Sequence, residues 1–354
     1  MSDSSVPAGG TRPIRLGLGT GYDPSANCRE MGRWMHDAEE RGFEVGFFSE
    51  TAELMRDSVT ALSSFAASTT TMTLGCTQVV RLRSPLIMAQ TIASLDELSG
   101  GRIMLAPGAC TNTHARRNGL PEVDSVRGLV EQIEVLRLLL TGEKVTYEGE
   151  TVTLTDVSLG WRPLRADVPL YVASTSRRGL QIAGSVGDGV LLNAVCSPEY
   201  TENAVKILRA ASDEAGRDWS KFTVAQLINC SIEDDHQLAL DRVRWEVASK
   251  LNPFQIEVIF RSKARVGEPY MHVEDIERFK QAWRDGGKEG LLRAVPDSYV
   301  EGMTAVGDID TVAAKVQRYF DAGVDICILR PAAPHQLPDL LTTSERLKAA
   351  PAHL

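Results

Sequence analysis

The run Ser174-Thr175-Ser176-Arg177-Arg178-Gly179 combines hydroxyl groups with two guanidinium groups, between a predicted strand and a predicted helix. Backbone N–H groups at a helix amino terminus bind phosphate, and arginine adds bidentate, charge-assisted hydrogen bonds. The alternative is an ordinary helix cap followed by solvated arginines. The combination favours a phosphate site formed by Ser174, Thr175, Ser176 and Arg177.

Glu50 and His114 are the candidates for moving protons. Glu50 follows a predicted strand at residues 45–49, and His114 follows a predicted strand at residues 102–106. An imidazole titrates at about pH 6.5 and a pocket can raise a carboxyl toward the same range, so both side chains suit acid and base chemistry. The alternatives are a Glu50 carboxylate that bonds a backbone amide and a His114 imidazole in water.

The glycine-rich stretch Gly17-Leu18-Gly19-Thr20-Gly21 lies where a dinucleotide-binding fingerprint would start, at the first predicted strand. Its third glycine is misplaced, and no acidic residue ends a second strand at the distance that a ribose requires. We interpret Gly19 as part of a strand end that passes close under a ligand.

The histidines show no HxxxH spacing and the six cysteines form no CxxC pair, so no metal site is predicted.

The formal charge is −9 and no basic cluster occurs, which argues against a nucleic-acid partner. No apolar stretch approaches the roughly 20 residues that span a bilayer. Residues 1–13 are small and polar, without the basic start and apolar centre of a signal peptide, and are predicted to be a disordered leader. We therefore expect a cytoplasmic protein with a small-molecule substrate.

Eight apolar runs of strand length recur along the chain, and they are continuous rather than alternating. Such runs suit strands that are buried on both faces of a parallel sheet. The predicted strands are Ile14–Thr20, Val45–Ser49, Met72–Val79, Arg102–Ala106, Pro169–Ala173, Gly189–Asn193, Phe222–Cys230 and Val324–Leu329.

Seven segments between these strands carry apolar residues at three- and four-residue spacing, which is typical of helices. The predicted helices are Arg29–Gly42, Asp57–Thr69, Pro85–Leu98, Ser125–Leu140, Arg177–Val186, Pro198–Ala215 and Ile309–Ala322. This alternation allows a closed barrel or an open sheet. Extra segments after the fourth strand (residues 120–128 and 144–165) and after the seventh (residues 234–299, mostly helical) favour an α/β fold with a single (β/α)8 TIM barrel over residues 14–354.

Three stretches resemble the luciferase-like monooxygenase superfamily. The first runs from Thr91-Ile92-Ala93-Ser94 to Gly101-Arg102, at the helix and turn before the fourth strand. The second comprises Pro169–Ser174 and Asp188–Asn193, and it is similar to the methylenetetrahydromethanopterin-reductase-like branch. The third is Ala322-Gly323-Val324-Asp325. The resemblance extends from about residue 14 to residue 333 in the family's order.

The resemblance implies a barrel that holds FMN or the deazaflavin coenzyme F420 at the carboxyl ends of its strands. In members with a known cofactor, a bulge with a non-prolyl cis peptide after strand three lies behind the ring. The corresponding residues here are Cys76, Thr77 and Gln78, with the candidate bond at Thr77–Gln78; the alternative is an ordinary trans strand end. Gly108 opens the small-residue loop after strand four, and the phosphate is expected at residues 174–177.

The chain departs from the family's deazaflavin-dependent sugar-phosphate dehydrogenases. Their Asp-His pair is Glu50-Thr51 here, their acidic residue after strand four is Thr111, and an asparagine is His114. The histidine base is therefore missing from its own position, so sugar-phosphate oxidation is not implied. Thr111 and His114 remain candidate cofactor contacts.

The preferred hypothesis is hydride transfer between coenzyme F420 and a small organic substrate, in which the protein orients the reactants and excludes water. The main alternative is an FMN-dependent monooxygenase that uses reduced flavin and oxygen. Thr51 and Thr111 also suggest a non-catalytic cofactor-binding barrel, and the poor glycine fingerprint disfavours an open-sheet nicotinamide dehydrogenase. Because the family often pairs through helices near strands two and three, a homodimer is expected.

Overall fold

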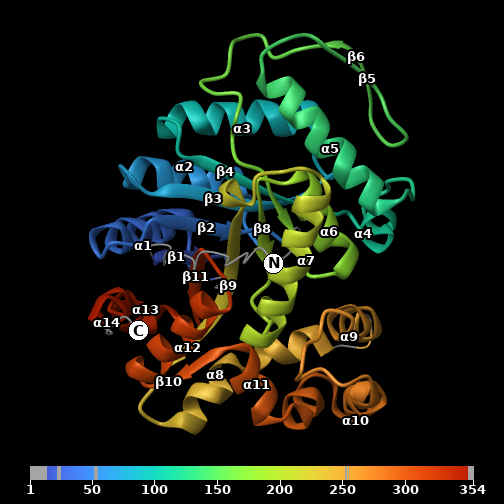
Figure 1. Ribbon diagram of the computed structural model, residues 1–354. Coiled ribbons are helices and arrows are strands. Elements are labelled where there is room, and N and C mark those ends of the chain that lie inside the picture. Colours follow the sequence, from blue (N-terminus) through green and yellow to red (C-terminus); the bar gives the residue numbers. More distant parts are fainter. Residues whose placement is uncertain (1–13, 22–24, 52–54, 252, 254, 350–354) are drawn as a thin grey trace, which may run out of the picture.

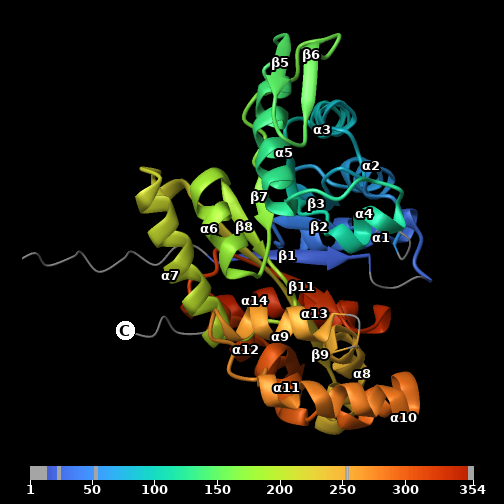
Figure 2. The same cartoon turned by 90° about the vertical axis from the view of Figure 1, so that its right-hand side faces the viewer.

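The structure is a computed structural model that describes residues 14–21, 25–51, 55–251, 253 and 255–349. Figure 1 and Figure 2 show a central barrel with helices around it, a hairpin projecting at one end and a helical insertion at the other. The predicted leader at residues 1–13 lies outside the described residues.

Eight parallel strands close into a barrel, as the sequence predicts. In order around the barrel they are β1 (Arg15–Thr20), β2 (Val45–Ser49), β3 (Thr73–Val79), β4 (Ile103–Gly108), β7 (Tyr171–Ala173), β8 (Gly189–Leu192), β9 (Thr223–Ile232) and β11 (Ile326–Pro331). The pairing of β8 with β9 and of β11 with β1 closes the ring. The short strand β10 (Ala305–Gly307), which was not predicted, pairs with the last residues of β9.

Each barrel strand is buried on both faces because one face lines the lumen and the other packs on the helices. In β2, Val45 and Phe47 belong to the lumen core, whereas Phe48 packs in the outer core. In β9, Ala225 and Leu227 line the lumen in the same alternation. Successive side chains of a strand point to opposite faces, which explains the continuous apolar runs.

The seven predicted helices are present, each beginning within one residue of its expected start. They are α1 (Cys28–Glu40), α2 (Ser58–Ser68), α3 (Pro85–Ser99), α5 (Ser125–Leu140), α6 (Arg177–Val186), α7 (Pro198–Glu214) and α12 (Ile309–Asp321). A Ser, Asp or Asn side chain accepts a first-turn N–H at the start of every one of them. These caps satisfy amides that otherwise lack a partner at a helix start.

The Gly100-Gly101-Arg102 motif has a structural role. Gly100 and Gly101 both have positive φ, at 71° and 85°, and they end α3. The Arg102 guanidinium then donates to the carbonyl oxygens of Met72, Ala66 and Thr69, while its Nε donates to Ser99 O. One side chain thereby satisfies carbonyls at the ends of two helices, which leave such groups open.

The first extra segment contains α4 (Asn112–Arg117) and an antiparallel hairpin of β5 (Val145–Glu148) and β6 (Thr153–Val157). The hairpin follows α5 and extends alongside it (Figure 2). We expected an extra segment here but not these strands. Their residues are partly exposed and polar, so the sequence lacks the apolar pattern of a buried strand.

The second extra segment, between β9 and β10, is helical as predicted. It contains α8 (His236–Ala248), α9 (Ile256–Ala264), α10 (Ile276–Ala294) and α11 (Asp297–Met303). These helices share a buried cluster of their own that includes Phe260, Phe279 and Leu291. Four short 3-10 turns also occur: η1 (Trp219–Lys221), η2 (Ser249–Leu251), η3 (Val273–Asp275) and η4 (Pro334–Gln336). The last helices of the described residues are α13 (Leu337–Leu341) and α14 (Thr343–Ala349).

Candidate functional site

A cavity of about 350 Å³ opens at the carboxyl ends of the barrel strands, and we call it the mouth cavity. Its barrel wall comes from β3, β4, β7, β8 and β9, and its opposite wall comes from α9 of the helical insertion. The lining residues are Thr77, Ala109, residues 173–176, residues 191–193, Leu227, Val258, Ile259, Ser262 and Lys263. In TIM barrels this end of the strands is the one that carries the active site.

The mouth of the barrel offers space and unused polar atoms. A Cβ added to Gly108 would be in ordinary van der Waals contact with the Ala173 Cβ at 3.7 Å, and Gly108 itself does not line the mouth cavity, whereas the next residue, Ala109, does. Ser49, which follows the lumen-facing Phe47 by two positions, has no hydrogen-bond partner for its buried Oγ in the described part of the chain; the same holds for Nδ2 of Asn229. Buried polar atoms without partners are rare in folded proteins. This combination fits a flat, polar-edged ring such as that of a flavin or deazaflavin.

Ser174, Thr175 and Ser176 all line the mouth cavity at the start of α6. Ser176 caps this helix by accepting the Gly179 N–H at 3.0 Å, and the carbonyl of Thr175 accepts a 2.6 Å hydrogen bond from the Tyr200 hydroxyl. The first amides of α6 and three hydroxyl-bearing residues thus lie beside one cavity. This is the arrangement that suits a phosphate group.

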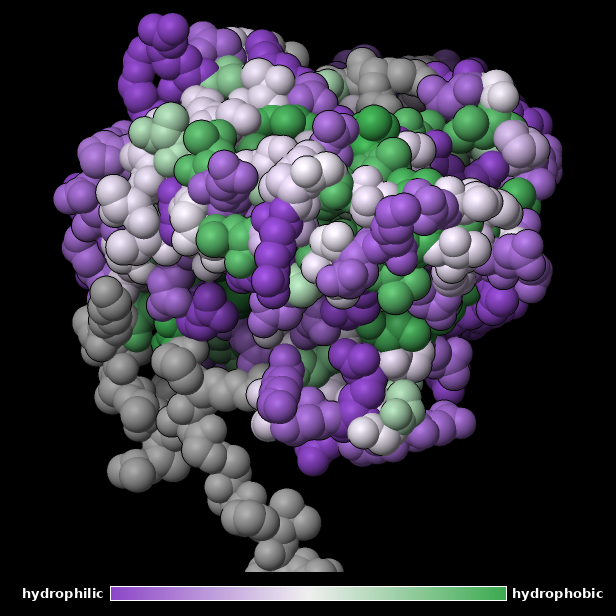
Figure 3. All heavy atoms as spheres, turned by 90° about the horizontal axis from the view of Figure 1, so that it is seen from above, coloured by the Kyte–Doolittle hydropathy of each residue, from purple (hydrophilic) through white to green (hydrophobic). Residues whose placement is uncertain are grey.

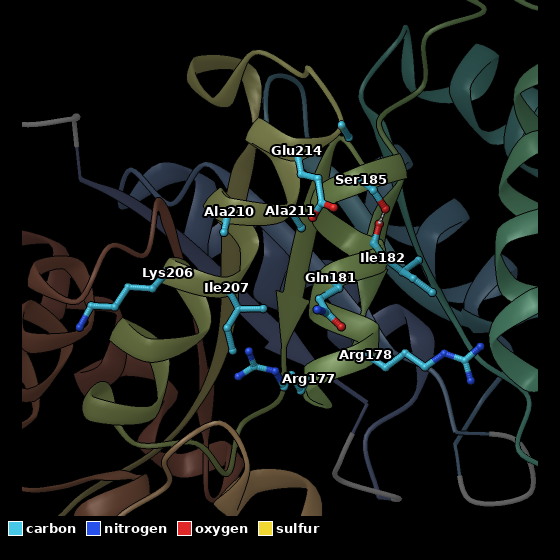
Figure 4. A pocket seen from close by; sticks show the side chains of 11 residues that line it. Arg177, Arg178, Gln181, Ile182, Ser185, Lys206, Ile207, Ala210, Ala211 and Glu214 are labelled. Carbon is cyan, nitrogen blue, oxygen red and sulfur yellow. Dashed lines mark hydrogen bonds between the residues drawn. The ribbon is translucent and has the colours of Figure 1, made fainter.

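Arg177 lies at the same helix start but lines a different hollow. This outer groove of about 530 Å³ lies between α6 and α7, and Figure 4 shows Arg177, Arg178 and Lys206 along it. Arg178 is exposed and pairs with Asp124 at 3.3 Å. The structure therefore does not bring Arg177 into the mouth cavity with the three hydroxyl residues.

Of the candidate ring contacts on β3, only Thr77 lines the mouth cavity. Its hydroxyl donates to the carbonyl of Glu50 at 3.2 Å, which ties the ends of β2 and β3 together. Cys76 and Gln78 face the helices instead: burial and then the Glu50 charge raise the pKa of Cys76 to about 12, and Gln78 donates to the Ser58 hydroxyl. Every peptide bond in the described residues is trans, so Thr77–Gln78 takes the trans form in this structure.

Glu50 lies at the same end of the barrel, but its carboxylate is already engaged. It accepts two hydrogen bonds from Arg83, the shorter at 2.6 Å, and one from the Ser58 N–H at 2.8 Å. The same guanidinium also bonds Asp57 at 2.6 Å. The Glu50 side chain is 12% exposed, so this ion pair is largely removed from water. The geometry gives Glu50 a structural role in holding the start of α2.

Thr111 and His114 belong to the start of α4, directly after β4. Thr111 caps this helix by accepting the His114 N–H. Neither residue lines the mouth cavity. Both residues lie at the carboxyl end of the barrel strands, but the structure does not bring their side chains to the wall of the mouth cavity.

Gly19 lies at a second cavity of about 350 Å³, between β1, β11 and α8. A Cβ at Gly19 would approach the Cγ of Arg330 to 2.7 Å, so a glycine is required for this arginine to cross the strand. Arg330 is 5% exposed, and its guanidinium lies 3.5 Å from the Glu246 carboxylate. The group that lies closest over Gly19 in the structure is therefore an arginine side chain of the protein itself, and a ligand at Gly19 stays a prediction.

Lys263 is the residue of the mouth cavity that the sequence did not suggest. It extends from α9 and is 4% exposed. Ile256, Phe260 and Lys263 are spaced by four and three residues, which is the spacing of one buried helix face. A lysine on a buried helix face could have indicated a functional residue in the sequence, because lysine is almost never fully buried without a partner.

Two kinds of feature are absent from the described residues. No group of three His, Cys, Asp or Glu side chains there could hold a metal ion. No helix in the same part of the chain is long and apolar enough to cross a membrane.

Known proteins resemble this chain over most of its length. It is 26% identical over 314 residues to a 5,10-methylenetetrahydromethanopterin reductase of Archaeoglobus fulgidus, covering 87% of this chain and 91% of the relative. It is 29% identical over 320 residues to an F420-dependent glucose-6-phosphate dehydrogenase of Nakamurella multipartita, covering 84% and 88%. The structure of the coenzyme F420-dependent tetrahydromethanopterin reductase from Methanopyrus kandleri superposes with a TM-score of 0.81 at 24% identity, covering 95% of this chain and 99% of that one.

The family model described as luciferase-like monooxygenase matches residues 10–326. This span includes all of the barrel strands up to the start of β11, together with both extra segments. The chain belongs to the luciferase-like monooxygenase family.

Proposed function

We propose that the protein catalyses hydride transfer between coenzyme F420 and a small organic substrate at the mouth cavity. The observation that carries the proposal is the cavity itself, in which Thr77, the hydroxyls of residues 174–176 and the start of α6 meet at the carboxyl ends of the strands. The relatives named for F420 chemistry support the choice of cofactor.

When bound, the cofactor supplies the centre that accepts or donates the hydride. Thr77, Ala109 and Ala173 would lie against its ring, and residues 174–176 with the first amides of α6 would bind its phosphate. The apolar lining of Leu191, Leu227 and Ile259 excludes water from the reacting atoms. The protein's contribution is therefore to orient the two reactants and to shield them.

Isothermal titration of the purified protein with F420 and, separately, with FMN tests the cofactor. We expect micromolar binding of F420. The variant Ala109→Leu should weaken this binding at least about tenfold, because Ala109 lines the mouth cavity and a larger side chain would fill part of it, while thermal denaturation checks that the variant is folded. Gly160→Leu is the control, since a Cβ at Gly160 has no neighbour within 4 Å and Gly160 does not line the mouth cavity. Micromolar binding of FMN with none of F420 would replace this proposal with the FMN-dependent monooxygenase.

The engagement of Glu50 by Arg83 favours one second candidate, a non-catalytic cofactor-binding protein. F420 binding without turnover across a panel of carbonyl, imine and alkene substrates would support that candidate. Turnover of any member of the panel would exclude it.

We also propose that the protein acts in the cytoplasm as a homodimer. Large apolar side chains are exposed on α3, α5 and the segment before β7, including Ile87 (48% exposed), Leu98 (57%), Leu138 (43%) and Leu164 (57%). Figure 3 views the molecule from above Figure 1, the side on which α3, α5 and the hairpin lie, and shows hydrophobic residues among polar ones there. Exposed apolar patches rimmed by polar residues mark protein interaction surfaces.

A further inference from the structure

The cavity at Gly19, which we call the second cavity, has a volume of about 350 Å³ and opens at the same end of the barrel as the mouth cavity. Its walls come from the ends of β1, β9 and β11 and from the helices α1 and α8. The described residues that line it differ from those that line the mouth cavity. The strand ends therefore carry two cavities, and β9 contributes to both.

Asn229 relates the two cavities to each other. It follows Leu227 by two positions on β9, so both side chains point to the same face of the strand, with their backbones about 7 Å apart. Leu227 lines the mouth cavity, and Asn229 lines the second cavity. A substrate that reacts in the mouth cavity can thus place its other end in the second cavity.

Asn229 also offers a hydrogen-bond donor that the protein does not use. The side chain is 2% exposed, and its Nδ2 has no hydrogen-bond partner in the described part of the chain. A buried amide group without a partner costs free energy, and an acceptor that reaches it removes this cost. Because Asn229 lies in the cavity wall, a ligand is in a position to supply that acceptor.

The two charged side chains among the described lining residues compensate each other. The Arg330 guanidinium is 5% exposed and lies 3.5 Å from the Glu246 carboxylate, whose side chain is 33% exposed. Burial and the Arg330 charge lower the pKa of the nearby Lys250, which favours its neutral form, although Glu246 opposes this shift. An anionic or cationic ligand group would therefore lose its water without gaining a free countercharge.

The rest of the wall is mainly apolar and includes the indole of Trp34 and the side chains of Val243 and Pro331. Pockets of this kind bind the apolar body of a ligand, and a few polar groups fix its orientation. Asn229 can donate a hydrogen bond here, and the partly exposed Glu246 carboxylate can accept one. These groups match a neutral ligand that presents an acceptor and a donor side by side.

We propose that the second cavity binds the non-reacting end of the substrate and selects a neutral, carboxamide-like group on an apolar body. The carbonyl of this group accepts from Asn229 Nδ2, and its N–H donates to Glu246. The identification of the ligand as the substrate rests on the proposed function, whereas the selection of a neutral group by this cavity does not.

Tryptophan fluorescence of the F420-free protein during titration with benzamide tests the cavity. Benzamide is neutral and carries a carbonyl and an amide N–H on an aromatic ring, and binding beside Trp34 should change the emission of that residue. We expect millimolar affinity, as is usual for a small fragment. Trp34→Phe should remove the change in emission, which locates the bound fragment.

Charged fragments of the same size test the selection in the wild-type protein. Benzoate and benzylamine should bind at least about tenfold more weakly than benzamide, because each would bury a charge beside one of the same sign. Tighter binding of either fragment would overturn the proposal. So would an absence of benzamide binding, or an emission change that persists in Trp34→Phe.

Asn229→Leu should weaken benzamide binding about tenfold, which corresponds to the loss of one hydrogen bond. Thermal denaturation checks that the variant is folded. Asn193→Leu is the matched control, because it makes the same substitution at a residue that lines the mouth cavity. It should leave benzamide binding unchanged, and an equal loss in both variants would contradict the assignment to the second cavity.

Repeating the benzamide titration with saturating F420 separates this proposal from the proposed function. Benzamide binding that persists supports a place for the substrate beside the cofactor, whereas competition would assign the second cavity to the cofactor and overturn the proposal. An Asn229-dependent benzamide response in a protein that does not bind F420 would contradict the proposed function and leave the selection of a neutral group supported.

Discussion

Glu50 follows β2 at the mouth of the barrel, yet both of its carboxylate oxygens are bonded. Arg83 and the Ser58 N–H hold them, and the side chain is only 12% exposed. A substrate group that exchanged a proton with Glu50 would first have to displace Arg83 or the Ser58 N–H from this carboxylate. At the scale of single residues, the hydrogen-bond partners of a carboxylate therefore say more about its role than its position at the end of a strand does.

We expect Glu50→Gln to lower the free energy of unfolding by about 2 kcal/mol at neutral pH, because it leaves a partly buried Arg83 with weaker partners. Chemical denaturation measures this loss. Asp57→Asn is the control, because Asp57 is the more exposed partner of the same Arg83 guanidinium, with a side chain that is 47% exposed. The substitution keeps the helix cap, since asparagine caps a helix as well as aspartate does. The control should lose less than about 1 kcal/mol. If Glu50→Gln leaves the free energy of unfolding unchanged, the structural role assigned to the Glu50–Arg83 pair is wrong.

At the scale of elements, a buried carboxylate helps to hold the hairpin onto α5. Glu131 has a fully buried side chain and accepts the N–H groups of Glu150 and Thr151, both at 2.8 Å, and the Thr151 hydroxyl at 2.6 Å. A Cβ at Gly149 would lie 2.5 Å from the Glu131 carboxylate, so the turn passes there only as glycine. The hairpin is thus fixed by these polar contacts together with apolar ones, since Val145 and Val152 are buried in the main core.

This anchoring predicts a pH-dependent contribution to stability. Burial raises the pKa of Glu131, but the hydrogen bonds from Thr151, Glu150 and Arg127 outweigh burial and lower the pKa from 4.5 to about 2. Since the folded-state pKa is depressed, the contribution is complete above about pH 4.5 and is lost as the pH falls toward 2. Glu131→Gln should therefore lower the free energy of unfolding by about 2 kcal/mol at neutral pH, and the difference from the wild type should shrink below pH 4.5.

Urea denaturation between acidic and neutral pH measures this difference. Glu148→Gln is the control, because Glu148 is an exposed residue of the same hairpin. It should leave the free energy of unfolding within about 0.5 kcal/mol of the wild type. A Glu131→Gln deficit that stays constant down to pH 2 would contradict the proposed anchoring by charge.

At the scale of the whole molecule, the exposed apolar side chains on α3 and α5 predict the assembly. Leu98→Glu should convert the proposed dimer to a monomer, which light scattering after size-exclusion chromatography measures, because a charge in an apolar interface loses its water without gaining a partner. Leu238→Glu is the control, since Leu238 is 42% exposed on α8 in the other extra segment. A monomeric wild-type protein, or a control that dissociates equally, would contradict the proposed interface.

The order and type of the main elements follow from the sequence alone. Eight continuous apolar runs and seven amphipathic segments correspond to the barrel strands and their helices, because burial on both faces leaves a clear local pattern. The hairpin and β10 were not predicted. The hairpin strands are polar, and β10 has three residues, which is too short for any periodicity.

The sequence also predicted which strand ends would carry the site, and the structure places Thr77 and residues 174–176 along one cavity at those ends. The tertiary structure alone decided which charges are available there. Glu50 is neutralised by an arginine 33 positions away, whereas Lys263, from a helix outside the barrel, lines the cavity of the hydroxyl residues and pairs with no carboxylate of the described residues. Two charges interact when they lie a few ångströms apart in space, and the positions of the residues along the chain do not predict that distance. The burial of a strand, in contrast, can be predicted from the apolar residues of the strand itself.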